Sequence, residues 1–311
     1  MAKLENFNGR YCESEFECAF VSFLEAEGWT YSAGNKINRV TKRDVLIADD
    51  FKKFLTETNH DLTEDEITKI FDNVRLVGGE SDFATLHKVY GWMVDGVQFT
   101  PKNGLAKMVP LIDFENPDKN IFRVVNQLVL EYTNNGQKET RRPDVILYVN
   151  GLPLCVIELK NPTDEKATIY NAWEQITIRY WRDIPHLLHY CPLACISDGV
   201  KTRLGTVRTP YEHFYAWRRV NDGDKISSLP FAETQTMIKG VYSPARFLEI
   251  FRDYIYFQDA IYDKNEQEIV CRYPQFFAAR LLKQSIVKSV VEKSGKGGTY
   301  FGATGCGKTY T

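Results

Sequence analysis

Two short and almost wholly apolar stretches, residues 144–149 and 154–160, lie close together near the middle of the chain. Runs of this kind indicate strands, and Asn150-Gly151 between them is typical of a tight turn. A strand without polar alternation must be covered on both faces of its sheet. Further strands are expected at 122–132 and 193–197. Helices are expected at about 14–28, 63–74, 82–91, 168–181, 244–257 and 274–293. The chain is therefore predicted to be an α/β protein.

The composition sets limits on the class of protein. With 311 residues the chain can form about two domains and needs no disulfide to hold a core. The seven cysteines are an odd number without a C-x-x-C pair, so we expect reduced thiols and a cytoplasmic protein. No signal peptide and no run of apolar residues long enough to span a membrane is visible. The net charge of −2 means that any nucleic-acid binding must come from a local basic surface.

Three polar side chains stand at the ends of the two central strands. Glu158 and Lys160 are two residues apart and leave the same face of their strand, and Asp144 begins the preceding strand. A two-residue turn would place Asp144 opposite Ile157 and send the two acids to opposite faces. A three-residue or bulged connection would place Asp144 opposite Glu158. We predict the latter, because the polar groups otherwise lack partners.

Two acids and an amine in one place suit phosphodiester cleavage. Asp144 and Glu158 can bind Mg²⁺, which needs only one or two carboxylates and keeps several waters. Lys160 can orient or deprotonate a water, or stabilise developing negative charge. The alternative is an exposed Glu–Lys pair at a strand end, which contributes under about 1 kcal/mol.

These residues resemble the PD-(D/E)xK nuclease signature. Residues 141–162 are similar to the version found in restriction (R) subunits of type I restriction–modification enzymes, and residues 111–117, 120–127, 183–185 and 197–199 agree with it. The resemblance implies a restriction-endonuclease-like mixed β-sheet flanked by helices and Mg²⁺-dependent cleavage of double-stranded DNA. It also implies partners, the methyltransferase (M) and specificity (S) subunits, and cleavage after ATP-driven translocation stalls.

The family also carries a Gln and a Tyr on the helix after the second strand, and these support cleavage. Gln175 and Tyr180 are the matching candidates, but they are five residues apart where the family spacing is four. On a regular helix their side chains would diverge by about 140°. Either a π-bulge realigns them or one has another role. In several relatives a Glu of the first helix faces the site, and Glu17 is the candidate here, although a capping box with Ser14 also explains it.

Residues 302–309 fit the phosphate-loop pattern G-x-x-x-x-G-K-[ST] in full, after an expected strand at 299–301. The predicted ATP-binding residues are Gly302, Gly305, Gly307, Lys308, Thr309 and, by a loose resemblance to the adenine-recognising Gln motif of superfamily 2 motors, Gln275. The rest of such a motor does not follow in the chain. We therefore expect an N-terminal fragment that would use ATP only within the full-length subunit.

The predicted organisation is an endonuclease domain at 1–220, a linker at 221–245 and the truncated start of a RecA-like P-loop lobe at 246–311. A group of basic residues could form a face for the DNA backbone or a solvated surface: Lys201, Arg203, Arg208, Arg218 and Arg219. Two other functions remain open. One is a non-cleaving DNA-binding or docking module of a helicase-type ATPase, and the other is a free-standing ATPase of that type.

Overall fold

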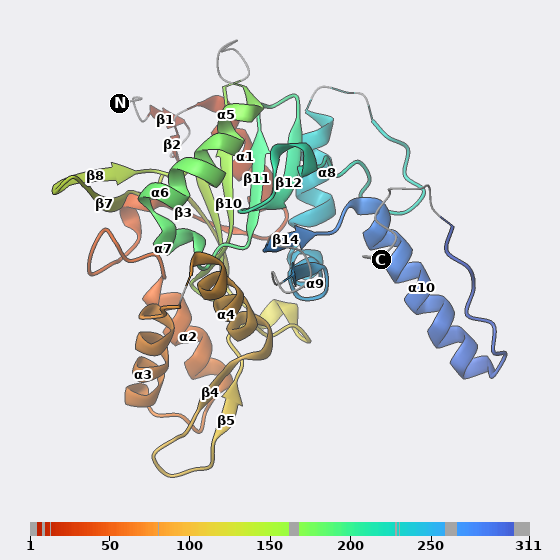
Figure 1. Ribbon diagram of the computed structural model, residues 1–311, viewed down its shortest axis with the longest axis horizontal. Helices are drawn as coiled ribbons and strands as arrows, with labels where there is room; N and C mark the ends of the chain where they lie inside the picture. The colour runs from red at the N-terminus through yellow and green to blue at the C-terminus, as the bar shows by residue number, and fades with distance from the viewer. Residues whose placement is uncertain are drawn as a thin grey trace.

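A computed structural model describes residues 5–7, 10–12, 14–79, 81–161, 168–227, 229, 231–258 and 266–301. Its centre is a six-stranded sheet with the order β12-β11-β10-β9-β6-β3 (Figure 1). The strands are β3 (Thr30–Ala33), β6 (Phe122–Asn126), β9 (Val145–Val149), β10 (Leu152–Leu159), β11 (Leu193–Ser197) and β12 (Thr202–Thr206). The β3–β6 and β10–β11 pairs are parallel and the other pairs are antiparallel. The sheet is therefore mixed, as the family resemblance implied.

The two apolar runs form the middle of this sheet. Every residue of β9 and β10 is buried, which confirms that both faces are covered. The prediction of a single strand at 122–132 is wrong. Strand β6 ends at Asn126, and a separate strand, β7 (Leu130–Asn134), follows. The break falls at Gln127, whose φ of 53° lies in the left-handed region. Such a backbone cannot continue a strand.

Helices cover the sheet on both faces. In the view of Figure 1, α5 (Ile169–Glu174) packs on β10 and β11 in front of the sheet, and α1 (Glu15–Ala26) lies behind it with α8 (Ala232–Val241). The helix expected at 168–181 is α5 continued by η3 (Gln175–Tyr180) and α6 (Trp181–Asp183). The strand expected at 193–197 is confirmed as β11, and the helix expected at 14–28 is confirmed as α1.

A smaller group of helices lies below the sheet in Figure 1: α2 (Ala48–Thr58), α3 (Glu64–Arg75) and α4 (Asp82–Asp95), with the hairpin of β4 (Val97–Phe99) and β5 (Lys107–Val109). The capping box at the start of α3 forms between Thr63 and Glu66. The helix α2 was not expected from the sequence. The turn at Gly151 holds it in place, because Ile47 N, at the start of α2, donates to Gly151 O at 2.9 Å.

The remaining elements are short hairpins and single turns. They are β1 (Glu5–Phe7) with β2 (Arg10–Cys12), β7 with β8 (Gln137–Arg141), β13 (Ile255–Gln258) with β14 (Gln267–Val270), η1 (Gly34–Lys36), η2 (Pro117–Lys119), η4 (Tyr211–His213) and α7 (Pro185–Leu188). Within the described parts of the chain, every helix is too short or too polar to cross a membrane.

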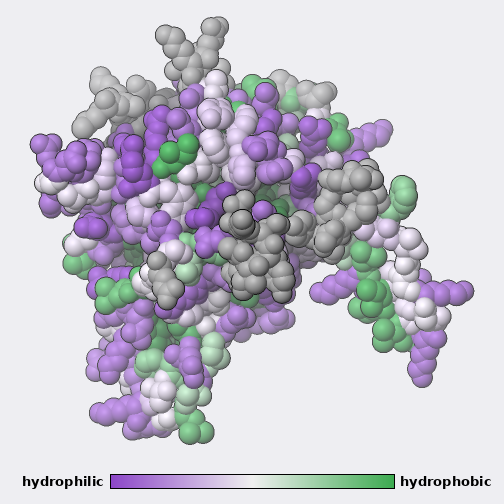
Figure 2. Space-filling model, viewed as in Figure 1, coloured by the Kyte–Doolittle hydropathy of each residue, from purple (hydrophilic) through white to green (hydrophobic). Residues whose placement is uncertain are grey.

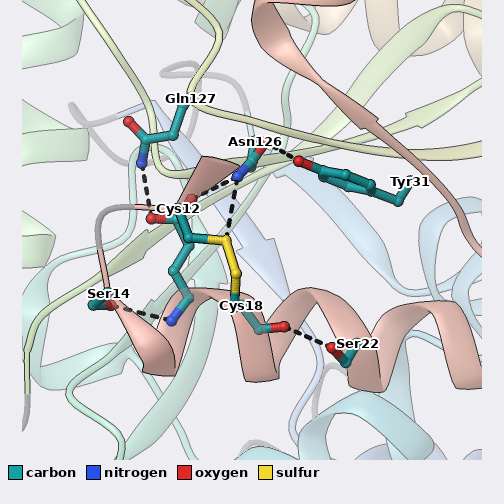
Figure 3. The surroundings of a disulfide bond; sticks show 8 residues. Cys12, Ser14, Cys18, Ser22, Tyr31, Asn126 and Gln127 are labelled. Atoms are coloured by element: carbon teal, nitrogen blue, oxygen red, sulfur yellow. Dashed lines mark hydrogen bonds between the residues drawn. A yellow bond between two sulfur atoms is a disulfide. The ribbon is translucent and has the colours of Figure 1, made fainter. Parts of the chain in front are cut away.

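The cysteines are not all reduced, contrary to the expectation from their spacing. Cys12, at the end of β2, and Cys18, on α1, form a disulfide across a sequence separation of 6 residues (Figure 3). The turn from β2 into α1 brings their Cα atoms to 5.8 Å, within the range a disulfide needs. Four other cysteines of the described residues are unpaired: Cys155, Cys191, Cys195 and Cys271.

The C-terminal part begins with helices that join the same core. The predicted linker, 221–245, contains α8, and α9 (Pro244–Asp253) follows it. Trp29 packs against Phe247 of α9 and donates from Nε1 to Tyr242 O at 2.6 Å. The proposed boundary between an endonuclease domain and a motor lobe stays a prediction.

Helix α10 (Tyr273–Glu292) projects from the body of the molecule and carries several exposed apolar side chains, seen on the right of Figure 2. The strand expected at 299–301 does not form, because these residues have no neighbouring strand to pair with in the described chain. The RecA-like lobe is therefore a prediction that the described residues do not test.

Candidate active site

The pairing of β9 with β10 decides where the two acids lie. A two-residue turn joins the strands, and the register then shifts by one residue between Pro153 and Cys155. After this bulge Ile157 lies opposite Val145, so the next pair in register is Asp144 with Glu158. The bulged connection predicted from the sequence is confirmed, and both acids leave the same face of the sheet.

The Asp144 carboxylate is oriented by two donors. Its Oδ2 accepts a hydrogen bond from Leu159 N at 2.7 Å, and its Oδ1 accepts one from Gln127 Nε2 at 3.3 Å. The first donor belongs to the main chain of β10, beside Glu158. The second comes from the break after β6. Asp144 is therefore held between two elements of the sheet.

Glu158 is fully buried, and its two oxygens differ. Oε1 accepts a hydrogen bond from the Tyr180 hydroxyl. Oε2 has no hydrogen-bond partner among the described residues and lies 3.8 Å from Lys160 Nζ. Burial raises the pKa of Glu158 well above its ordinary value, the charge of Asp144 adds to this, and the charge of Lys160 opposes it.

Lys160, Gln175 and Tyr180 form one hydrogen-bonded chain. Lys160 Nζ donates to Gln175 Oε1 at 2.8 Å, and Gln175 Nε2 donates to the Tyr180 hydroxyl at 2.9 Å. Residues 175–180 form a π-helix, in which hydrogen bonds join residues five apart. The wider turn brings both side chains to the same side of the helix. Of the two alternatives left by the sequence, the structure has the π-bulge.

A third acid reaches this region from the opposite face of the sheet. Glu17 lies in the first turn of α1 and is 2% exposed. Its carboxylate accepts hydrogen bonds from Asn126 Nδ2 at 2.8 Å and from Gln127 Nε2 at 3.0 Å. Ser14 caps the helix by accepting from Glu17 N, so the main chain of Glu17 serves the cap while its carboxylate faces the site.

Sequence reasoning missed Asn126 and Gln127 as part of the site. A usable signal was present, because two amides follow the apolar residues 124–125. Buried polar side chains at a strand end need partners. What the sequence did not show is that the partner is Glu17, more than a hundred residues earlier.

The amino-acid sequence is similar to those of known restriction enzyme subunits. Residues 11–213 match the family model described as "Type I restriction enzyme R protein N terminus". The chain belongs to this family. A relative from Methanocaldococcus jannaschii, named as the type I restriction enzyme MjaIXP endonuclease subunit, is 28% identical over 95% of this chain and 30% of its own length. The type I restriction enzyme HindI endonuclease subunit of Haemophilus influenzae is 30% identical over 96% of this chain and 29% of its own length. The chain thus spans less than a third of the length of these relatives.

The oxygen donors of the candidate site fit a hard cation. Asp144 and Glu158 supply carboxylate oxygens, and Glu158 Oε2 is buried without a hydrogen-bond partner among the described residues. A buried carboxylate oxygen without a hydrogen bond is costly unless a cation or proton satisfies it, and the cation nearest to Oε2 in the described chain is the Lys160 ammonium at 3.8 Å. No group of three His, Cys, Asp or Glu side chains that could hold a metal occurs in the described chain. A set of two carboxylates fits Mg²⁺, which uses few protein ligands and keeps several waters.

The predicted nucleotide site is mostly beyond what the structure covers. Gly302, Gly305, Gly307, Lys308 and Thr309 lie outside the described residues. Gln275 is described and lies in the first turn of α10. Its Oε1 accepts a hydrogen bond from Arg272 N at 2.8 Å. A cavity of about 480 Å³ is lined by residues that include Tyr273, Pro274 and Thr299, and Gln275 is not among its lining residues.

The basic residues predicted as a DNA-facing group do not share one environment. Arg208 lies over the rings of Phe83 and Trp181 and pairs with Glu266 at 3.5 Å. Arg203 lies over the ring of Tyr211. Arg203 and Arg208 are therefore engaged in contacts with aromatic rings, and the choice between a DNA-facing group and a solvated surface stays open.

Proposed function

We propose that the chain is the endonuclease part of a type I restriction enzyme R subunit, a cytoplasmic enzyme that hydrolyses phosphodiester bonds of double-stranded DNA. Asp144 and Glu158 would hold Mg²⁺. The single observation that carries the proposal is the Glu158 carboxylate, which is buried beside Asp144 and Lys160 with Oε2 lacking a hydrogen-bond partner in the described chain. The names of the relatives support the same activity.

Asp144 and Glu158 would hold the cation, and the chemistry that it would supply is activation of a water and compensation of the negative charge on the phosphate oxygens in the transition state. Lys160 has its own task. Its ammonium group has three donors, and Gln175 accepts one of them at 2.8 Å. Lys160 is thereby held next to Glu158 with donor capacity for a water or for a phosphate oxygen.

Gln175 and Tyr180 would act as positioning residues. Tyr180 is fully buried and donates to Glu158, and Gln175 joins Tyr180 to Lys160. The chain of hydrogen bonds fixes the distance between the acid and the amine. Because the π-helix sets this chain, the helix after β10 would be part of the catalytic apparatus and not only a cover for the sheet.

Assembly with other subunits and ATP-driven translocation are proposed from membership of the restriction enzyme family. The full-length subunit would assemble with M and S subunits. Its phosphate loop and Gln275 would bind ATP and Mg²⁺ for DNA translocation. The competing function is a docking module that grips DNA without cutting it. The buried Glu158, beside Asp144 and a lysine, favours the nuclease, because burying its carboxylate costs stability that a docking role does not require.

Cleavage of plasmid DNA by the assembled complex tests the proposal. We expect Lys160→Ala to lower the cleavage rate by at least about a hundredfold, while Lys138→Ala, which removes an exposed lysine paired with Glu131, leaves the rate unchanged. Omission of Mg²⁺ should abolish cleavage by every variant. Equal cleavage by the wild type and Lys160→Ala would contradict the proposal. No cleavage by either, with DNA binding retained, would favour the docking module.

A further inference from the structure

Gln127 has a backbone conformation that few residue types adopt. Its φ is 53°, in the left-handed region, and it is 5% exposed. For a residue other than Gly, Asn or Asp this conformation costs about 1 kcal/mol or more. Strain of this kind persists only where the surroundings hold the residue in place.

The conformation changes where the side chain of Gln127 points. Successive residues of a strand face opposite sides of a sheet. Here Asn126 and Gln127 are consecutive, yet both amides donate to the carboxylate of Glu17, at 2.8 and 3.0 Å. The left-handed residue breaks the alternation, so that the second amide is delivered to the same acid.

Gln127 also holds Asp144 in two ways. Its backbone N donates to Asp144 O at 3.0 Å, and its Nε2 donates to Asp144 Oδ1 at 3.3 Å. Since Leu159 N binds Oδ2, both oxygens of Asp144 are oriented, one of them by Gln127. The amide group of Gln127 thus has one hydrogen for each of two carboxylates.

The orientation of this amide follows from the same contacts. If the group were turned over, its oxygen would face the carboxylates of Glu17 and Asp144, which are acceptors. In the observed orientation Gln127 Oε1 is buried without a hydrogen-bond partner among the described residues. An unsatisfied buried acceptor costs about 1–3 kcal/mol. The side chain is therefore held by its two donor contacts, against that cost.

We propose that Gln127 is a positioning residue for the candidate active site: it fixes the orientation of Asp144 and couples Glu17 to it, so that acids from both faces of the sheet form one cluster. The inference rests on the proposed cation site at Asp144 and Glu158. Residues that orient a metal ligand through a hydrogen bond commonly change metal affinity by about 10–100-fold when they are replaced.

The test uses the substitution Gln127→Asn. Asparagine tolerates a positive φ, so the backbone is retained, but its side chain is one methylene shorter and cannot bridge the two acids. Gln127→Gly removes the side chain and relieves the strain, which gives a second variant in case the first folds poorly. Gln98→Asn, at an exposed position of β4, is the matched control.

Binding of Mn²⁺ to the chain without nucleotide is measured by electron paramagnetic resonance, and thermal unfolding is followed in parallel. We expect Gln127→Asn and Gln127→Gly to bind Mn²⁺ about tenfold or more weakly, with Gln98→Asn like the wild type. In the assembled complex the Mg²⁺ concentration for half-maximal cleavage should rise by a similar factor. A purely structural role would lower the unfolding temperature and leave the affinity of the folded protein unchanged.

The outcomes separate this inference from the proposed function. An Mn²⁺ affinity of both Gln127 variants within about twofold of the wild type, or no Mn²⁺ binding by the wild type, overturns the inference. Weaker Mn²⁺ binding by the variants together with a wild-type complex that does not cut DNA supports the inference and rejects the nuclease. Normal cleavage with unchanged Mn²⁺ binding in the variants leaves the nuclease standing and removes Gln127 from its site.

Discussion

Substitution of Gly151 should test how the turn between β9 and β10 supports the site. Gly151 has a φ of 76°, and a Cβ there would lie 2.2 Å from Ile47 O and 2.9 Å from Phe51 N. The left-handed backbone costs an alanine about 1 kcal/mol, and displacing a packed backbone costs about 1–3 kcal/mol more. We therefore expect Gly151→Ala to lower the free energy of unfolding by about 3 kcal/mol.

The chain contains a matched control for this substitution. Gly136 follows Asn135 in the turn between β7 and β8, as Gly151 follows Asn150, and the φ values of the two glycines are 77° and 76°. A Cβ on Gly136 would have nothing within 4 Å. Gly136→Ala should therefore cost only the backbone term, about 1 kcal/mol.

Both variants are measured by equilibrium urea unfolding of the chain, followed by circular dichroism. The difference of about 2 kcal/mol between them reports the contact with the start of α2. Since the same turn precedes the bulge that pairs Asp144 with Glu158, Gly151→Ala should also impair cleavage in the assembled complex, whereas Gly136→Ala should not. If the two variants lose the same stability, the close approach of Gly151 to Ile47 is refuted.

Three further predictions concern stability. Tyr180→Phe removes the hydroxyl that donates to the buried Glu158, and should lower the free energy of unfolding by about 2 kcal/mol in urea; an unchanged value would show that the bond is not formed. Burial raises the pKa of Glu268 in the folded protein well above its ordinary value of 4.5. The folded state therefore holds this proton more tightly than the unfolded state, and the free energy of unfolding falls as the pH rises above 4.5 towards the raised pKa. Glu268→Gln should accordingly become progressively more stable than the wild type between pH 5 and 8 in thermal melts, and a pH-independent difference would contradict this. Reduction of Cys12–Cys18 should lower the free energy of unfolding by about 2 kcal/mol, measured in urea with and without reductant; a double Cys→Ser variant that is as stable as the oxidised chain would disprove it.

The local sequence pattern predicted structure correctly where burial and hydrogen bonding act between residues that are close in the sequence. The capping box of Thr63 with Glu66 is formed as expected, because it uses residues only three positions apart. At Ser14 the hydroxyl accepts from Glu17 N as expected, but the Glu17 carboxylate accepts from Asn126 and Gln127. The bulge in β10 was predicted from the need to pair two polar ends, and it is present. The site residues that depend on these strands, Asp144 and Glu158, could therefore be placed on one face in advance.

The predictions that were wrong concern features that depend on the three-dimensional arrangement of the chain. The strand expected at 122–132 breaks at Gln127, because that residue bonds to Glu17 and Asp144. The disulfide of Cys12 with Cys18 depends on how β2 turns into α1, a geometry that the spacing of cysteines does not show.

The amino-acid order by itself determined the covered strands, the tight turn between them, and the presence of two acids and a lysine at their ends, since apolar runs and turn residues act over a few positions. Only the tertiary structure decided that residues 175–180 wind as a π-helix, that Glu17 faces the cluster, and that Gln127 joins it to Asp144. These features are set by side chains that meet across the sheet from remote positions. Their energies arise from burial and pairing in three dimensions, which no local pattern contains.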